Sequence, residues 1–282
     1  MKFFERLLLI LTVFILLFSA CKKDELITDA SAKLGFSTDS VLFDTVFTTV
    51  GSTTKLFKIY NPHNQTINIS KAYLATGTAS QFRMNIDGVS GTLLQNIEIM
   101  AGDSLFVFVQ VTVNPTNQNS PLLINDSIVF ETNGNTQHVN LTAVGQDVHL
   151  HKPNVFPTNG LPPYSIINCN EIWTNDKPHL IFGYAVVDEN CKLTIMPGTK
   201  VHLGVRSVLW IYDGGTLEVK GAKGNEVIFQ GSRLEPDYQD VSGQWGKIWL
   251  SAGSINNTID WAIIKNGNIG VQADTLGAST QP

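Results

Sequence analysis

Charged side chains are scarce in this chain. Of its 282 residues, 19 are Lys or Arg and 24 are Asp or Glu, which is 15% with a formal net charge of −5. Soluble globular domains carry about 25% charged residues. The apolar share is ordinary at 43%, so a disordered chain of low hydrophobicity is excluded. No basic cluster extends beyond Lys22 and Lys23, so nucleic acid is not expected as a partner.

Long apolar runs are also scarce, which excludes a protein that crosses a membrane with several helices. The one such run, Leu7 to Phe18, is broken only by Thr12. It is shorter than the roughly 20 residues that a membrane-spanning helix needs. Because a short basic segment precedes it, the run indicates the hydrophobic region of a signal peptide covering residues 1–20.

The segment Leu17-Phe-Ser-Ala-Cys21 resembles the lipobox of bacterial lipoproteins. This resemblance implies cleavage before Cys21, lipidation of its thiol and a membrane partner reached through the lipid anchor. Phe18 stands where the pattern prefers Leu, and an ordinary secretory signal is the alternative. The following Lys23-Asp-Glu25 is similar to the export signal of Bacteroidetes-type surface lipoproteins. It implies surface exposure on the bacterial outer membrane, and a merely solvated tether over residues 21–32 is the alternative.

Residues 33–148 alternate between short β-rich segments and turn residues. A domain of this pattern is predicted to be an all-β sandwich. Its strands are expected at 34–37, 41–47, 55–60, 67–70, 81–86, 96–99, 105–113, 126–132 and 138–144.

The order of three phrases in this segment is more specific. Phe57-Lys-Ile-Tyr-Asn-Pro62, Ile99-Met-Ala-Gly-Asp-Ser104 and Val139-Asn-Leu-Thr-Ala-Val-Gly145 resemble the immunoglobulin-like domains of the major sperm protein and ASPM–SPD-2–Hydin groups. Those families are structural or interaction modules, so the resemblance implies a domain without catalytic residues.

Pro-rich residues 149–180 are interpreted as a junction and N-terminal cap. His149 and His151 could share one strand face and hold a metal, but no third ligand of suitable spacing stands near them. A solvated linker is therefore preferred there, and no metal site is predicted.

Residues 181–282 contain a repeat. Leu193 recurs at Leu217, a step of 24 (217 − 193), and Ile248 recurs at Ile269, a step of 21 (269 − 248). A third series joins 200–203, 226–229 and 258–261. Such steps predict a solenoid with about three strands per coil. Alternation predicts that one set of side chains points inward: Leu193, Ile195, Leu217, Val219, Val227, Phe229, Ile259, Trp261 and Ile263.

A coil of this length resembles the right-handed parallel β-helix of pectin-lyase-like proteins. Residues 188–199 and 243–248 look like β-helix repeats of Bacteroidetes-type surface lipoproteins. The chain ends about three coils in and without an amphipathic cap, so the β-helix is expected to be incomplete at the C-terminus, as in a fragment.

Cysteine is rare too, with Cys169 and Cys191 as the only ones besides Cys21. In an oxidising compartment such a pair indicates a disulfide. Residues one coil apart stack about 4.8 Å apart, which lies within the roughly 4.4–6.8 Å between Cα atoms that a disulfide accepts. The pair is predicted to form a disulfide that holds the first coil at the end of the solenoid.

One coil is interrupted by a loop that is rich in carboxylates and aromatic rings. It is predicted as a candidate ligand-binding loop for a sugar, or for Ca²⁺ through its carboxylates. The alternative is a loop that packs over the edge of the coil with solvated charges. Its candidate residues are Arg233, Glu235, Asp237, Tyr238, Asp240 and Trp245.

These features together predict a lipid-anchored cell-surface protein without catalytic residues or a resident cofactor. Its sandwich would be a spacer and its β-helix a platform for a glycan or another surface protein. The alternative is a polysaccharide lyase or hydrolase whose active coils follow residue 282. Fold alone does not decide between them, because function depends on the site.

Overall fold

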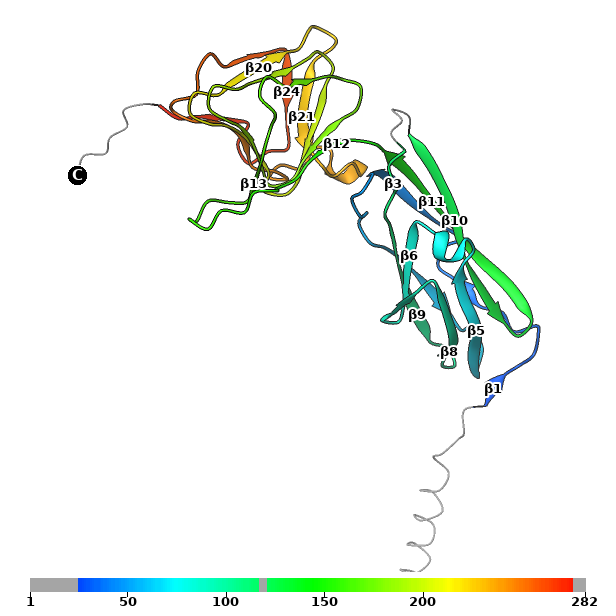
Figure 1. Ribbon diagram of the computed structural model, residues 1–282. Coiled ribbons are helices and arrows are strands. Elements are labelled where there is room, and N and C mark those ends of the chain that lie inside the picture. Colours follow the sequence, from blue (N-terminus) through cyan, green and yellow to red (C-terminus); the bar gives the residue numbers. More distant parts are fainter. Residues whose placement is uncertain (1–24, 117–120, 276–282) are drawn as a thin grey trace, which may run out of the picture. The chain divides into compact units, whose positions relative to one another are not determined.

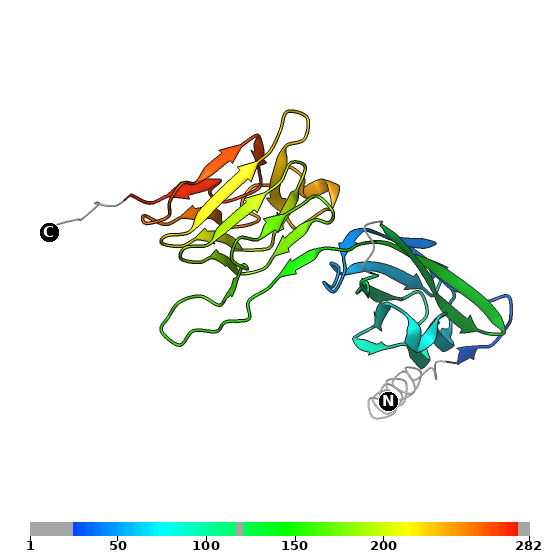
Figure 2. The same cartoon turned by 45° about the horizontal axis from the view of Figure 1, so that its top comes forward.

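The computed structural model describes residues 25–116 and 121–275. The predicted signal peptide, the predicted lipidation site Cys21 and the last residues of the chain lie outside this range. Within it, two compact units contain strands β1 to β25 and the short 3-10 helices η1 (Gly77–Ala79) and η2 (Pro236–Tyr238) (Figures 1 and 2). No described helix has the length and apolar character that a membrane span requires.

Strands β1 to β11 form an immunoglobulin-like sandwich of two sheets. The first sheet has the order β1 (Leu26–Ile27), β5 (Thr66–Leu74), β10 (Leu122–Thr132), β11 (Asn135–Gln146) and β3 (Ser40–Phe47), with β8 (Leu93–Ile99) also paired to β5. The second has the order β2 (Gly35–Phe36), β4 (Lys55–Tyr60), β9 (Ser104–Val111), β6 (Phe82–Ile86) and β7 (Val89–Gly91). The pairs β5–β10 and β5–β8 in the first sheet and β2–β4, β4–β9 and β6–β7 in the second are antiparallel, whereas β1 runs parallel to β5.

Alternation along β4 and β9 separates the core from the outer face of the second sheet. Phe57 and Val107 are paired across the two strands and are buried, whereas Leu56 and Phe108 are paired and exposed. Each of the nine predicted strands is present, and β1 and β7 were not predicted. The correction at β1 is that Leu26–Ile27, in the predicted tether, pairs with β5.

Strands β12 to β25 form three parallel sheets that stack as a β-helix. One contains β12 (His149–His151), β15 (His179–Ile181), β18 (Lys200–Leu203), β21 (Val227–Gly231) and β24 (Ala262–Ile264). The second contains β13 (Tyr164–Ile166), β16 (Tyr184–Val187), β19 (Val208–Ile211), β22 (Lys247–Leu250) and β25 (Val271–Ala273). The third contains β14 (Ile172–Trp173), β17 (Lys192–Ile195), β20 (Thr216–Lys220) and β23 (Thr258–Asp260).

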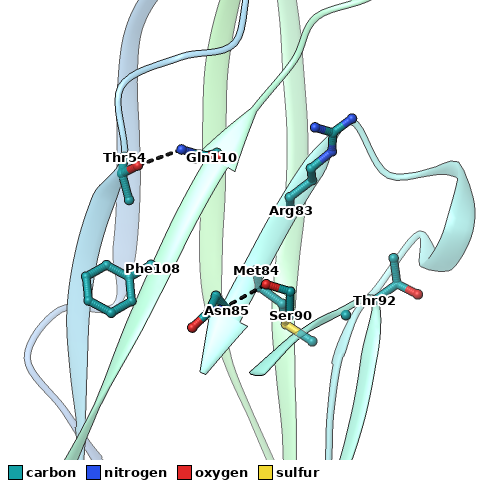
Figure 3. Close-up of a pocket in the computed structure, with 9 residues that line it drawn as sticks. Thr54, Arg83, Met84, Asn85, Ser90, Thr92, Phe108 and Gln110 are labelled. Carbon is teal, nitrogen blue, oxygen red and sulfur yellow. Dashed lines mark hydrogen bonds between the residues drawn. The ribbon is translucent and has the colours of Figure 1, made fainter. Parts of the chain in front are cut away.

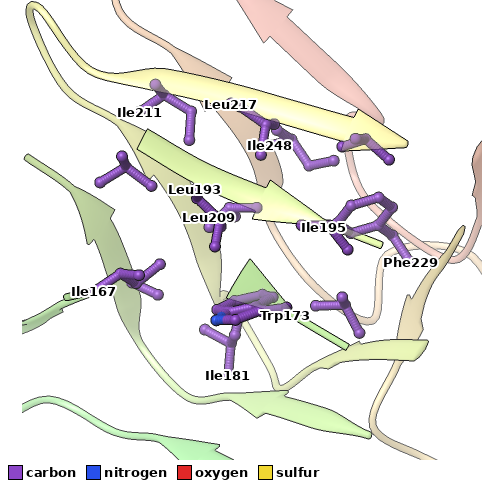
Figure 4. Packing of buried hydrophobic residues seen from close by; sticks show 14 of the residues in the cluster. Ile167, Trp173, Ile181, Leu193, Ile195, Leu209, Ile211, Leu217, Phe229 and Ile248 are labelled. Atoms are coloured by element: carbon purple, nitrogen blue, oxygen red, sulfur yellow. The ribbon is translucent and has the colours of Figure 1, made fainter. Parts of the chain in front are cut away.

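The inward positions of these sheets form one apolar core (Figure 4). Leu193 pairs with Leu217, as the step of 24 predicts, and both are completely buried. Six of the nine predicted inward residues, at 193, 195, 217, 219, 227 and 229, are completely buried. Burial of such stacks at about 25 cal/mol per Å² supplies the main stabilisation of the solenoid.

Three parts of the predicted register are wrong. Trp261 and Ile263 are 55% and 46% exposed. Trp261 lies at a corner with φ 46°, and this left-handed residue between β23 and β24 shifts the alternation. Residues 258–261 continue the β20 ladder rather than the β18–β21 ladder, and Ile248 pairs with Val271 rather than with Ile269.

The segment predicted as a junction is already part of the solenoid. Strands β12, β13 and β14 form its first coil and pair in parallel with β15, β16 and β17. Cys169 and Cys191 join the first two coils in a disulfide with a Cα–Cα distance of 4.7 Å. Ile172 pairs with Thr194 across the first two coils, and each cysteine stands three residues before one of these two residues, so the two cysteines lie side by side. The predicted disulfide is confirmed.

Candidate functional site

A groove lies on the outer face of the second sheet of the sandwich (Figure 3). Its volume is about 760 Å³, within the range of about 300–1,000 Å³ that is usual for small-molecule sites. The strands β6, β7 and β9 contribute most of its walls. It is lined by Thr54, Arg83, Met84, Asn85, Ser90, Gly91, Thr92, Phe108 and Gln110.

Hydrogen bonds hold the amide side chains of the groove in place. Nε2 of Gln110 donates to Oγ1 of Thr54 at 2.7 Å, and Nδ2 of Asn85 donates to Oγ of Ser90 at 2.9 Å. The backbone N–H of Gly88 donates to Oδ1 of Asn85 at 2.9 Å. These contacts fix the orientation of Asn85 and Gln110, so that a ligand would meet preorganised polar groups.

Arg83 and Phe108 are the lining side chains that remain available to contact a ligand. The ring of Phe108 is 37% exposed. The guanidinium of Arg83 has no hydrogen-bond or ion-pair partner among the described residues. A guanidinium offers five N–H donors in a planar fork, which suits paired oxygen acceptors.

An aromatic ladder lies on the outer face of the β13–β16–β19–β22–β25 sheet of the solenoid. Trp210 pairs with Trp249 across β19 and β22. Tyr184 contacts Trp210 edge-on at 6.2 Å between ring centroids. Trp210 is only 9% exposed. With the buried Val186 and Val208 it forms a second, small apolar cluster outside the main core, against which Tyr184 and Trp249 pack.

The predicted ligand-binding loop is folded mainly on itself. The guanidinium of Arg233 donates to Glu235, with Nη2 to Oε1 at 2.9 Å, and lies over the ring of Tyr238 at 3.8 Å. Glu235 raises the pKa of Arg233 further through these hydrogen bonds. Asp237 and Asp240 are exposed.

Trp245 corrects the prediction for this loop. Its side chain is completely buried in the solenoid core, and its Nε1 donates to the backbone carbonyl of Lys265 at 2.8 Å. The ring is therefore not available to a sugar. Trp245 lies two residues before β22, where the chain re-enters the coil. It therefore fits the alternative in which this loop packs over the edge of the coil.

The histidines of the predicted linker form a closed stack instead of a solvated pair. Nε2 of His151 lies 3.1 Å from Nδ1 of His179, and the ring of His179 stacks on Trp173 at 4.2 Å. Burial lowers the pKa of His151 to about 4 and that of His179 to about 3. No group of three or more His, Cys, Asp or Glu side chains that could hold a metal occurs in the described parts of the chain.

The groove and the ladder were not predicted, although each left a trace in the sequence. In β9 the apolar residues continue onto the outer positions, where the exposed Phe106 and Phe108 alternate with the buried Val107 and Val109. In β19 and β22 a tryptophan occupies an outward position of each strand. Large apolar side chains on the outer face of a half-exposed strand are the signal that was available.

No family model matches the chain, and no curated protein matches it in sequence. Parts of it are similar to solved structures. A family 123 glycoside hydrolase from Clostridium perfringens is 5% identical, with 40% of this chain and 25% of that chain covered and a TM-score of 0.29. A protein of unknown function from Porphyromonas gingivalis is 12% identical, with 45% of this chain and 50% of that chain covered and a TM-score of 0.31.

The ASH/PapD-like domain of human CEP192 is 10% identical, with 45% of this chain and 94% of that domain covered and a TM-score of 0.30. The chain thus spans a quarter of the hydrolase and half of the Porphyromonas protein. Likenesses of this size carry no inference about function.

Proposed function

We propose that this protein is a lipid-anchored surface protein of a bacterial outer membrane that binds a glycan without cleaving it. The observation that carries the proposal is the groove of the sandwich, where the exposed ring of Phe108 and the unpartnered Arg83 line one cavity (Figure 3). The lipid anchor rests on the lipobox-like segment ending at Cys21.

A sugar offers one apolar face of C–H groups and a rim of hydroxyls. The ring of Phe108 suits the apolar face, because aromatic faces carry partial negative charge. Arg83, Asn85 and Gln110 are planar polar groups that can pair with neighbouring hydroxyls. The described lining of the groove contains Arg, Asn, Gln, Ser and Thr but no carboxylate, whereas glycoside hydrolysis generally employs two.

The test is a glycan array with the exported chain from residue 21, carrying Cys21→Ser to keep it free of lipid. We expect Phe108→Ala and Arg83→Gln each to weaken binding of the best glycan at least about tenfold, or 1.4 kcal/mol. Matched controls are Phe156→Ala, which removes a ring that is 70% exposed in the solenoid, and Arg206→Gln, which removes an exposed guanidinium there. No hit on any glycan would refute the carbohydrate ligand.

The anchor and the location need separate tests. Palmitate is expected to label the wild-type protein in cells but not the Cys21→Ser variant. Protease added to intact cells is expected to degrade a surface-exposed protein, whereas protection until the outer membrane is opened would place it on the periplasmic side. Equal labelling of both proteins would refute lipidation at Cys21.

A further inference from the structure

A small cavity lies next to the aromatic ladder, on the outer face of the first coils of the solenoid. Its volume is about 210 Å³, below the range of about 300–1,000 Å³ typical of drug-sized ligands, so it suits a single compact group. Strands β13, β16 and β19 contribute its floor. It is lined by Leu161, Tyr164, Ile166, Val186, Asp188, Trp210 and Tyr212.

Two aromatic rings form a corner of this cavity. The rings of Trp210 and Tyr212 are nearly perpendicular, at 84° with centroids 5.4 Å apart. Trp249, on the following coil, covers one face of Trp210 at 4.7 Å and 8°. The opposite face therefore looks toward the preceding coil, where Val186 pairs with Trp210 and lines the cavity.

Asp188 gives the corner a negative charge. Its Oδ1 accepts a hydrogen bond from the backbone N–H of Glu189 at 2.9 Å, which orients the carboxylate. Its Oδ2 has no hydrogen-bond partner among the described residues. The lining includes no Lys or Arg, so the charge of Asp188 is not neutralised from within the cavity.

We infer that this cavity binds an alkylated ammonium group, such as the trimethylammonium head of choline. The faces of aromatic rings attract cations, and recognition of quaternary ammonium groups uses aromatic corners of this kind. The carboxylate of Asp188 complements the charge, and Leu161, Ile166 and Val186 offer apolar surface to the methyl groups. The site is independent of the glycan groove, which lies in the other unit.

A neutral sugar fits this cavity less well than an alkylated cation. Each hydroxyl of a buried sugar needs a hydrogen-bond partner, and leaving one unsatisfied costs about 1–3 kcal/mol. The side-chain partners in the lining are the carboxylate of Asp188 and the phenols of Tyr164 and Tyr212. An alkylated ammonium needs no directed hydrogen bond, so contact with the apolar side chains of Leu161, Ile166 and Val186 leaves none of its groups unsatisfied.

The first experiment requires no variant. The exported chain with Cys21→Ser is titrated with choline and with 3,3-dimethylbutan-1-ol, which has the same shape without the charge, and binding is followed by calorimetry. We expect choline to bind at least about tenfold more tightly than the neutral alcohol, a difference of 1.4 kcal/mol. Equal binding of the two, or no binding of choline, would overturn the proposal.

Variants then locate the site. Asp188→Asn and Tyr212→Leu should each weaken choline binding at least about tenfold, whereas Asp260→Asn should not, since it removes an exposed charge from the third sheet. The glycan array is repeated with Asp188→Asn, and the glycans that bind the parent protein should still bind this variant. If a neutral methyl glycoside bound and Asp188→Asn abolished that binding, the ligand of this cavity would be a sugar, and the proposed alkylated ammonium would be refuted.

Two sources of the same head group can be distinguished. Vesicles of phosphatidylcholine present it on a membrane, and phosphocholine presents it free. Cosedimentation with the vesicles that choline competes away would identify a lipid head group as the ligand. Binding of phosphocholine without cosedimentation would identify a soluble or polymer-borne group, and failure of both along with choline would refute the site.

Discussion

The indole rings of Trp210 and Trp249 lie one above the other, with centroids 4.7 Å apart and planes inclined by 8°. The register of β19 and β22 sets this contact, because parallel strands place paired side chains directly over each other. Polar contacts fix both rings: Nε1 of Trp210 donates to Oγ of Ser251, and Nε1 of Trp249 donates to Oδ2 of Asp274 at 2.7 Å.

Replacing Trp249 tests this stack. We expect Trp249→Leu to lower the free energy of unfolding of the solenoid by about 2 kcal/mol, from an aromatic pair worth about 0.5–1.5 and a lost hydrogen bond worth about 1. All five tryptophans follow residue 172, so urea unfolding followed by tryptophan fluorescence reports on the solenoid alone. An unchanged midpoint would show that the stack adds no stability.

The disulfide is expected to stabilise the first coils. Closing a loop of 22 residues limits the entropy of the unfolded chain, which is worth about 3 kcal/mol. The double variant Cys169→Ser, Cys191→Ser should therefore unfold at lower urea concentration. Reductant should shift the wild type in the same direction and leave the double variant unchanged; a wild type indifferent to reductant would contradict this prediction.

His202 makes stability depend on pH. Burial lowers its pKa from 6.5 to about 4, and the charges of Lys200 and Lys265 act in the same direction against a hydrogen bond to Gly231. In the unfolded chain the imidazole of His202 is protonated below about pH 6.5, whereas in the folded chain it is protonated only below about pH 4. The contribution of His202 to stability is thus complete above pH 6.5, declines between pH 6.5 and 4, and is constant below pH 4.

The expected size of this effect is about 3 kcal/mol, since each pKa unit corresponds to 1.36 kcal/mol. Unfolding midpoints of the wild type and His202→Gln, measured from pH 7.5 to 4, should give a flatter profile for the variant. His151 and His179 shift in the same direction, so part of the slope should remain. Parallel profiles would refute the contribution of His202.

The two tryptophans at residues 245 and 261 should respond differently to the same substitution. Trp245→Phe leaves the partly buried carbonyl of Lys265 without its donor and opens space in the core, so we expect a loss of about 2 kcal/mol. Trp261→Phe changes a ring that is 55% exposed and should cost less than about 0.5 kcal/mol. Similar losses would mean that Trp245 is not part of the core.

The sequence predicted elements well where the signal is local. Alternating β-branched residues identify β4 and β9, and the 24-residue step between Leu193 and Leu217 identifies the coil. The two-residue strand β1 gives too little alternation to be recognised. Trp261 was misplaced because a left-handed corner breaks the alternation at that residue, and backbone conformation of that kind is rarely adopted by tryptophan.

Both candidate cavities depend on pairing between distant segments, which a single sequence does not display. Thr54 meets Gln110 only because β4 pairs with β9. Trp210 and Trp249 stand 39 residues apart (249 − 210), across the loop around η2, so no fixed period connects them. The cysteine pair was predictable because 22 residues is close to one uninterrupted coil.

The covalent link between Cys169 and Cys191 also sets how the protein responds to mechanical load. Under the lipid-anchored arrangement proposed above, the protein would be pulled whenever its ligand is fixed elsewhere. The loop closed by the disulfide cannot be drawn out, which withholds roughly 75 Å of extension at about 3.4 Å per residue over 22 residues. A pull that unravels the solenoid from its N-terminal side can therefore draw out β12 and β13, which precede Cys169, but it cannot extend the closed loop that contains β14, β15 and β16.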